Sequence, residues 1–224
     1  MTSLLLLLII PFVRAAHLPS AGGGPSISAQ EARSSFCGRV VAVSCEGPAS
    51  AVTLQIADPR GGSVWRVVIP PERRHLFGSR IEDRYEEQLV CLAPAAAAIT
   101  GRQFVLVRDP EQLVVRGPTQ AAIALPDDVF RTCDPEVELP TLVRQVHARF
   151  TVDAMRAKVH GSVFLRAIVD RSGVVRDIRV VHSLEPSLDD SASLALAQWE
   201  FRPATHRGAP VAVAISVQMT FTMR

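Results

Sequence analysis

The residues that come nearest to a catalytic pattern are His182, Ser183, Asp189 and Asp190. A serine hydrolase needs these residue types, because the histidine takes the proton of the serine and a carboxylate orients the histidine. Ser183, however, lacks the surrounding Gly-x-Ser-x-Gly pattern that exposes a nucleophile after a strand. The two aspartates fall in the first turn of a predicted helix, where carboxylates favour the helix dipole. We therefore expect no catalytic site here and no enzymatic activity.

The cysteines and histidines are candidate metal ligands, but their spacing does not favour a metal site. The four cysteines form no Cys-x-x-Cys pair, the spacing typical of zinc and thioredoxin-like sites, so we expect no metal and no cofactor. An even number of cysteines in an exported chain fits one or two disulfides, and three pairings are open. Among them we single out Cys45 with Cys91, which places the end of the first predicted strand against the start of the fourth. The histidines without ligand spacing are His17, His75, His147, His160 and His206.

The charge balance and the N-terminus bear on partners and location. A formal net charge of +2 gives no electrostatic reason to expect nucleic acid as a partner. Residues 4–13 form an apolar run, which has the length of a signal-peptide core and about half the length that a membrane-spanning helix needs. Cleavage after Ala15 would export the chain, so we expect a periplasmic protein. An uncleaved short anchor, which would associate the protein with the inner membrane, stays open as the alternative.

Changes in composition divide the chain into parts. They are a signal peptide (1–15), a flexible leader (16–35), a first domain (36–116), a linker (117–138) and a second domain (139–224). In the first domain, alternating apolar residues predict three strands, then Phe77, Ile81 and Tyr85 recur at helical spacing, and two further strands follow. This element order is that of an OB-fold, a small β-barrel, although a different small barrel stays open. We expect the domain to contact a small ligand or a protein, or to act as a spacer.

The second domain has an α+β pattern. A first helix is predicted from Leu139, because Pro140 suits the first helical turn and Leu142, Val143 and Val146 continue an apolar stripe. Two alternating runs separated by residues 170–173 predict a β-hairpin, and a second helix follows with Leu188 and Trp199 on its apolar face. Residues 211–222 alternate strictly and predict a last strand.

Residues 139–224 resemble the C-terminal domain of the TonB family. The resemblance rests on "AMRAKVHGSVFLRAIVDRSGVVRDIRVVHS", on "WEFRPA" and on "GAPV", and it implies a three-stranded antiparallel sheet with two helices. Within these motifs, two aromatic residues straddle the end of the second helix and close the core, a proline stops the helix, and a glycine and a proline turn the chain into the last strand. The residues of this structural motif are Leu188, Trp199, Phe201, Pro203, Gly208 and Pro210.

The resemblance also implies a function for the last strand. In TonB-like domains this strand lies at a sheet edge, and a short peptide of an outer-membrane transporter, the TonB box, adds beside it. Residues 211–222 carry no charge and no proline, which are the devices that normally protect an edge. We therefore expect a periplasmic peptide-binding protein, linked to transport across the outer membrane, whose partner is such a transporter or another envelope protein. The expected binding residues are Val211, Ala212, Val213, Ala214, Ile215, Ser216, Val217 and Gln218.

An alternative stays open: the strand pairs with its own chain or with a second copy, which would make the domain a structural or homodimerisation module. The sequence also departs from the transducing members of the family, which have an N-terminal transmembrane helix and a long Pro-rich spacer. The segment "HARFT" (147–151) replaces the family's Gln-Pro-x-Tyr-Pro-like segment, with Phe150 as the remaining aromatic residue. We therefore expect this protein to share the family's mode of peptide binding, but we do not extend energy transduction to it.

Overall fold

The computed structural model describes residues 36–45, 50–58, 64–78, 80–93, 98–99, 104–118 and 125–223. Its chain divides into two compact units, one within Ile10–Ala122 and the other comprising Ile123–Arg224. The predicted signal peptide and leader lie outside the described residues. Within the part that is described, no helix has the length and apolar character needed to cross a membrane.

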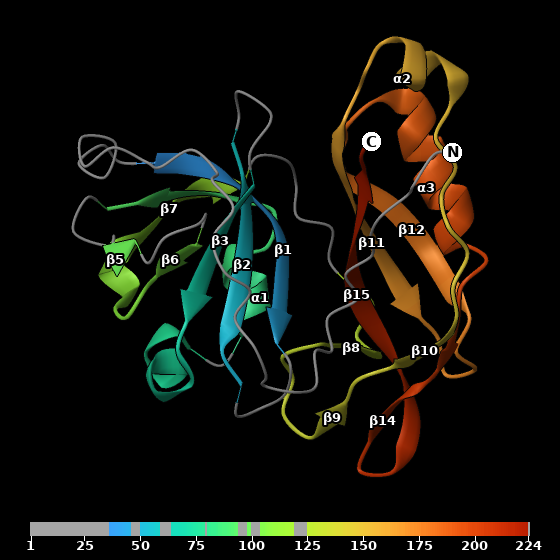
Figure 1. Cartoon of the computed structure of the whole chain (residues 1–224). Coiled ribbons are helices and arrows are strands. Elements are labelled where there is room, and N and C mark those ends of the chain that lie inside the picture. The colour runs from blue at the N-terminus through green and yellow to red at the C-terminus, as the bar shows by residue number, and fades with distance from the viewer. Residues whose placement is uncertain are drawn as a thin grey trace, which may run out of the picture. The chain divides into compact units, whose positions relative to one another are not determined.

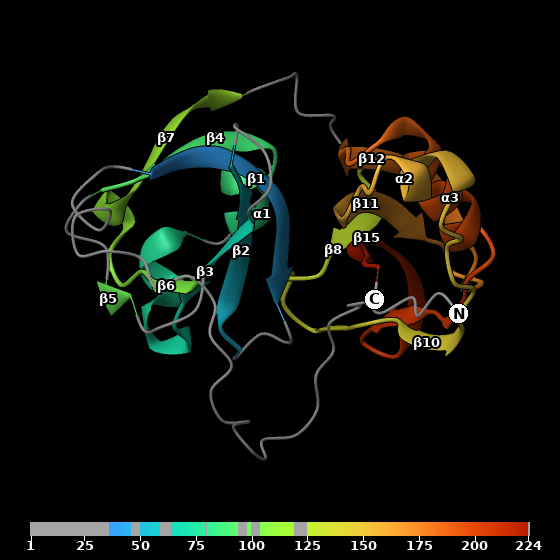
Figure 2. The same cartoon turned by 45° about the horizontal axis from the view of Figure 1, so that its top comes forward.

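The first unit is a seven-stranded sheet in the order β5-β6-β3-β2-β1-β4-β7 (Figures 1 and 2). All neighbouring strands are antiparallel except β3 and β6, which are parallel. The predicted inward residues Val52, Leu54 and Ile56 are fully buried. The OB-fold stays an interpretation of this topology. The strands are β1 (Phe36–Cys45), β2 (Val52–Ala57), β3 (Val64–Ile69), β4 (Gln88–Leu92), β5 (Ala98–Ile99), β6 (Phe104–Leu106) and β7 (Leu113–Pro118).

The predicted helix of the first unit is broken into two short pieces. A 3-10 helix, η2 (Pro71–Phe77), is followed by α1 (Ile81–Tyr85), and a further 3-10 turn, η4 (Pro110–Gln112), precedes β7. The break falls at Gly78, whose φ of +92° is incompatible with a continuous helix. The apolar residues that suggested the helix are nevertheless all buried.

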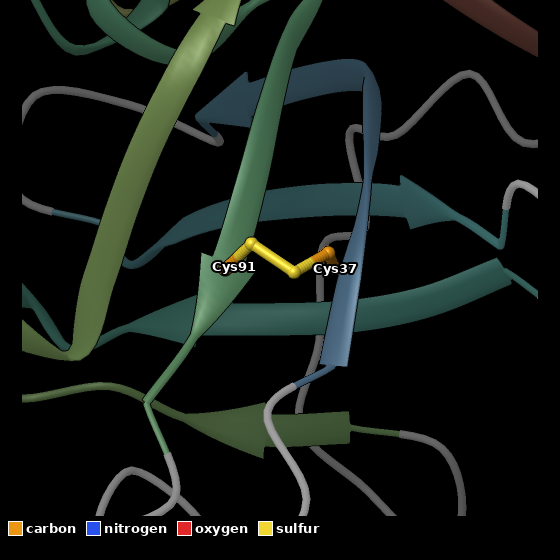
Figure 3. Close-up of a disulfide and its surroundings, with 2 residues drawn as sticks. All are labelled: Cys37 and Cys91. Carbon is orange, nitrogen blue, oxygen red and sulfur yellow. A yellow bond between two sulfur atoms is a disulfide. The ribbon is translucent and has the colours of Figure 1, made fainter.

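A disulfide crosslinks β1 and β4 in the first unit. Cys37 lies directly opposite Cys91 in the antiparallel ladder, with a Cα–Cα distance of 4.0 Å (Figure 3). The predicted pairing of Cys45 with Cys91 is therefore wrong. Cys45 lies at the other end of β1, where it faces Val52 of β2. None of the described cysteines is free.

The second unit is built on three long strands in the order β12-β11-β15 (Figure 1). Both neighbouring pairs are antiparallel, and α2 and α3 cover one face of the sheet, so the coarse α+β prediction is confirmed. The three strands, here called the central sheet, are part of a larger sheet: β14 and β9 continue it beyond β15, and β8 also pairs with β15. The elements are β8 (Val129–Arg131), β9 (Val137–Glu138), β10 (Thr141–Arg144), α2 (Val152–Arg156), β11 (Gly161–Val169), β12 (Val175–His182), α3 (Pro186–Leu196), β13 (Glu200–Arg202), β14 (Ala204–His206) and β15 (Ala209–Phe221).

Two predictions at the start of the second unit are wrong. Part of the segment predicted as a linker forms strands β8 and β9, which join the sheet. The helix predicted from Leu139 is absent, because Thr141–Arg144 is extended and pairs with β13. In that pairing Leu142 lies opposite Phe201, whereas Val143 is 66% exposed. The apolar stripe therefore reflects separate contacts of an extended segment and not one face of a helix.

Trp199 fixes this extended segment to the core. Its side chain is 1% exposed, and its indole N–H donates to the carbonyl oxygen of Val146 at 2.7 Å. Further along, Arg149 and Ser191 of α3 exchange two hydrogen bonds, from Arg149 N–H to Ser191 Oγ (2.9 Å) and from Ser191 Oγ to the Arg149 carbonyl (2.7 Å). The segment thus lies against α3 without being helical itself.

The turn between β11 and β12 packs closely against β13. The N–H of Phe201 donates to the carbonyl oxygen of Gly173 at 3.0 Å, and Gly173 has a φ of +86°. A Cβ atom at Gly173 would stand 1.8 Å from the carbonyl oxygen of Phe201. Asp170 closes the same turn by accepting hydrogen bonds from Arg176 Nε (2.6 Å) and from the N–H groups of Ser172 (2.9 Å) and Val174 (3.0 Å). The bond from Arg176 is the main reason why the pKa of Asp170 lies well below its usual range.

We expect the substitution Gly173→Ala to destabilise the second unit by about 3 kcal/mol, because it adds both backbone strain and a clash with β13. The matched control is Gly208→Ala, where φ is +81° but nothing lies within 4 Å of the added Cβ. For Gly208→Ala, backbone strain alone predicts that the free energy of unfolding falls by about 1 kcal/mol. Urea denaturation followed by fluorescence in a Trp65→Phe background reports the second unit through Trp199. Equal losses in the two variants would contradict the close packing of the turn.

The lowered pKa of Asp170 predicts an acid-sensitive contribution to stability. Stabilisation by the ionised carboxylate is complete above the unfolded-state pKa of about 3.9 and disappears as the pH falls below it towards the lower folded-state pKa. Asp170→Asn should therefore destabilise the protein at pH 7, and the loss should shrink between about pH 4 and pH 2. The exposed Asp153 provides the control substitution, Asp153→Asn. A loss for Asp170→Asn that does not depend on pH would show that the carboxylate's charge is not involved.

Candidate functional site

The candidate site is the edge of β15 that faces away from β11. On one side, β15 pairs with β11 without interruption from Val213 to Phe221. On the other side, β14 pairs with the start of β15, and β8, which lies beside β15 in Figure 2, pairs in parallel with Ala212–Ala214. Among the described residues, no strand pairs with this side of β15 from residue 215 to 221. We call residues 215–221 the open edge.

The structure divides the eight predicted binding residues into two groups. Val211, Ala212, Val213 and Ala214 have a strand of their own chain on this side, so the prediction of a free edge is wrong for these four. They are covered because the turn at residues 207–208 folds β14 back and because the predicted linker supplies β8. Ile215, Ser216, Val217 and Gln218 lie in the open edge. The open edge extends further than those eight residues, through Met219, Thr220 and Phe221, which continue the same alternation.

The side chains of the open edge are committed to the domain itself. Ile215, Val217, Met219 and Phe221 are at most 6% exposed and belong to the core. On the other face, Ser162 of β11 accepts a hydrogen bond from Gln218 Nε2 (3.0 Å) and pairs with the hydroxyl of Thr220 (2.9 Å). What β15 can offer to a partner is therefore its main chain, because alternate residues of a strand direct their N–H and C=O groups to one side.

The opposite edge of the central sheet is protected. Among the described strands, β12 pairs only with β11, but it carries the charges of Arg176, Asp177 and Arg179. Between Arg166 and Ile168 the register with β12 shifts, and Asp177 within that shift has a φ of +51°. Charges and β-bulges are the features that prevent a further strand from adding to an edge. The edge on β15 has neither charged residues nor a β-bulge from residue 215 to 221.

The open edge is supported at its C-terminal end by the segment that replaces the family's aromatic and proline-rich motif. The ring of Phe150 meets the ring of Phe221 edge-on at a centroid distance of 5.7 Å. The next residue, Thr151, caps α2 by accepting a hydrogen bond from Ala154 N–H (3.3 Å), and its hydroxyl pairs with that of Ser187 (2.6 Å). The aromatic packing expected of Phe150 is thus present.

The hydrolase-like residues do not form a triad. The hydroxyl of Ser183 donates to Asp189 and not to His182, and Asp189 also accepts from the N–H of Leu184 at 3.1 Å. The ring of His182 lies edge-on to the ring of Phe164 at 5.9 Å. Asp189 thus joins the end of β12 to the start of α3, which is a structural role. In the described part of the chain, no group of three or more His, Cys, Asp or Glu residues is placed to hold a metal ion.

The residues of the structural motif lie in the core or in the turn that leads into β15. Leu188, Trp199 and Phe201 are buried, and Pro203 separates β13 from β14. The hairpin between β14 and β15 has Arg207 (φ +52°) and Gly208 (φ +81°) at its tip, and Pro210 lies opposite Thr205 in its ladder. Two consecutive residues with positive φ match the right-handed twist of a hairpin.

Comparison with known proteins found a matching family model and similar solved structures. Residues 146–223 match the family model described as the Gram-negative bacterial TonB protein C-terminal. Among solved structures, the chain is similar to the solution NMR structure of the Pseudomonas aeruginosa TonB CTD, with 21% identity and a TM-score of 0.33. That similarity covers 42% of this chain and 93% of the other. A search of curated proteins found no match. The matched residues contain α2, α3 and the three long strands, so residues 146–223 of this chain are a TonB C-terminal domain.

Proposed function

We propose that this protein acts in the cell envelope by binding an extended peptide segment of another protein at the open edge of β15. The observation that carries the proposal is the contrast between the two edges of the central sheet. The edge on β12 has charges and a bulge, whereas residues 215–221 have no charge, no proline and no register shift. Main-chain hydrogen bonds would supply the affinity, and side chains on alternate peptide positions would supply the specificity.

The partner that fits the TonB C-terminal family is an outer-membrane transporter that presents its TonB box, or another envelope protein with a similar segment. The protein's role would then be linked to transport across the outer membrane. A periplasmic location is supported by the disulfide between Cys37 and Cys91, which persists in oxidising compartments. The first unit would add a second contact surface or act as a spacer.

Titration of the full-length, isotope-labelled protein with a seven-residue peptide of alternating threonine and valine tests the proposal. We expect amide shifts concentrated at residues 215–221, because no strand of the described part of the chain pairs with this side of β15 there. The matched control is the same peptide with proline at its centre, which cannot donate a central main-chain hydrogen bond and should bind more weakly. Equal binding of the two peptides would exclude strand addition.

Gln218 lies at the middle of the open edge, so a charge placed there should discriminate between charged peptides. In Gln218→Lys, we expect a peptide with a central glutamate to bind up to about fivefold more tightly than one with a central lysine. Val180→Lys puts the same charge on the protected strand β12 and should not discriminate. Discrimination by Val180→Lys alone would place the binding edge on β12.

The alternative, a homodimer that joins the open edges of two copies, gives a different result in the same experiments. A stable dimer in analytical ultracentrifugation, with residues 215–221 protected and no peptide response, would replace peptide binding by self-association.

A further inference from the structure

The middle of the open edge carries a polar side chain that an added strand would meet. Gln218 stands at the centre of residues 215–221, so a strand that covers most of this edge passes beside it. Its side chain is only partly buried, and it lies on the face of β15 that points away from the hydrophobic core. On that face, the residue of the added strand directly opposite Gln218 would have its Cβ atom about 5 Å away.

The amide group of Gln218 is held in place by the neighbouring strand. Its Nε2 donates to Ser162 Oγ of β11 at 3.0 Å, and the same Ser162 hydroxyl pairs with that of Thr220 at 2.9 Å. Ser162 and Thr220 lie directly opposite each other in the ladder between β11 and β15. Because its nitrogen is already bonded, the amide of Gln218 loses little side-chain freedom when a ligand binds to it.

The amide oxygen of Gln218 is the part of this side chain that stays available. The planar amide turns its oxygen away from the atom to which its nitrogen donates, and this oxygen is an acceptor. In the described part of the chain, Gln218 Oε1 has no hydrogen-bond partner. The two other polar side chains of the open edge are engaged, Thr220 with Ser162 and Ser216 in an interaction of its own.

A strand added beside β15 would take water away from this oxygen. An acceptor that loses water and gains no donor weakens binding, whereas one that gains a donor does not. A peptide side chain with a hydroxyl or an amide N–H supplies the donor, and an aliphatic side chain leaves the oxygen of Gln218 without one. Gln218 can therefore distinguish threonine from valine, although the two side chains have almost the same shape.

We propose that Gln218 determines specificity by accepting a hydrogen bond from a threonine, serine, asparagine or glutamine of the bound segment. The inference rests on the proposed function and names the class of segment that fits. It is an extended, uncharged stretch of an envelope protein in which hydrogen-bond donors alternate with apolar residues. The donors lie on the face of Gln218, and the apolar residues lie on the other face, beside the core residues of β15.

A double-mutant cycle on the full-length protein tests this role of Gln218. The seven-residue Thr/Val peptide is compared with an all-valine peptide of the same length, both extended by two lysines at each end for solubility. The protein variant is Gln218→Met, which removes the amide and nearly keeps the shape of the side chain. We expect the wild type to prefer the Thr/Val peptide about fivefold more strongly than Gln218→Met does. The ratio of the two preferences cancels the difference in strand propensity between threonine and valine.

The matched control is Gln198→Met, just after the end of α3. Nε2 of Gln198 donates to the main-chain carbonyl of Leu194 at 2.8 Å, so this variant also removes an amide that makes one hydrogen bond. Gln198 lies outside the sheet, and its substitution should leave the preference between the two peptides unchanged. An equal change of preference in both variants would contradict a direct contact with Gln218.

A second measurement uses the wild-type protein and does not depend on how Gln218→Met folds. A hydrogen bond to Gln218 Oε1 should move the side-chain carbonyl 13C resonance of Gln218 downfield when the Thr/Val peptide binds, and the all-valine peptide should not produce this shift. The same preference in wild type and Gln218→Met, or an equal response of this resonance to both peptides, would overturn the inference and leave the proposed function intact. Absence of binding by both peptides would overturn the proposed function and this inference with it.

Discussion

The second unit depends on the burial of Trp199 and on the single hydrogen bond that its indole makes. A buried indole N–H needs an acceptor, and here the acceptor is a main-chain carbonyl of a distant segment, that of Val146. The bond therefore ties the chain before α2 to the chain after α3 and closes the core between them. Phe201, two residues on, extends the same packing to the turn at Gly173.

The two edges of the central sheet differ in how far they are protected against the addition of a further strand. An antiparallel sheet that is not closed has two edges, and both attract other strands unless they are protected. In this domain the charged residues and the bulge lie on β12, and the uncharged run lies on β15. The asymmetry is visible in the sequence as the difference between "VRDIRVVH" and "APVAVAISVQMTF". This difference in sequence can be interpreted only when the strand at each edge of the sheet is known.

The elements with a strong local pattern were predictable. The β11–β12 hairpin, α3 and the alternation of β15 each follow from a period of apolar residues and from turn residues between them, and the structure confirms all three. The segments that sequence reasoning missed are short and are held by distant partners. Residues 141–144 are extended because β13 pairs with them, and residues 129–131 form a strand because β15 accepts them. The disulfide was also beyond prediction, because the register of β1 against β4, which brings Cys37 opposite Cys91, is a tertiary property.

The uninterrupted pairing of β11 with β15 has a consequence for the proposed binding of a peptide. Nine consecutive pairs without a bulge fix the register of β15, and a slip by one residue would turn its core side chains towards the opposite face. The register of β15 is therefore fixed. In the proposed binding, the incoming peptide would have to slide along the strand until its own alternation agreed with that of β15. Such binding would select among peptides by the position of their alternating side chains as well as by their composition.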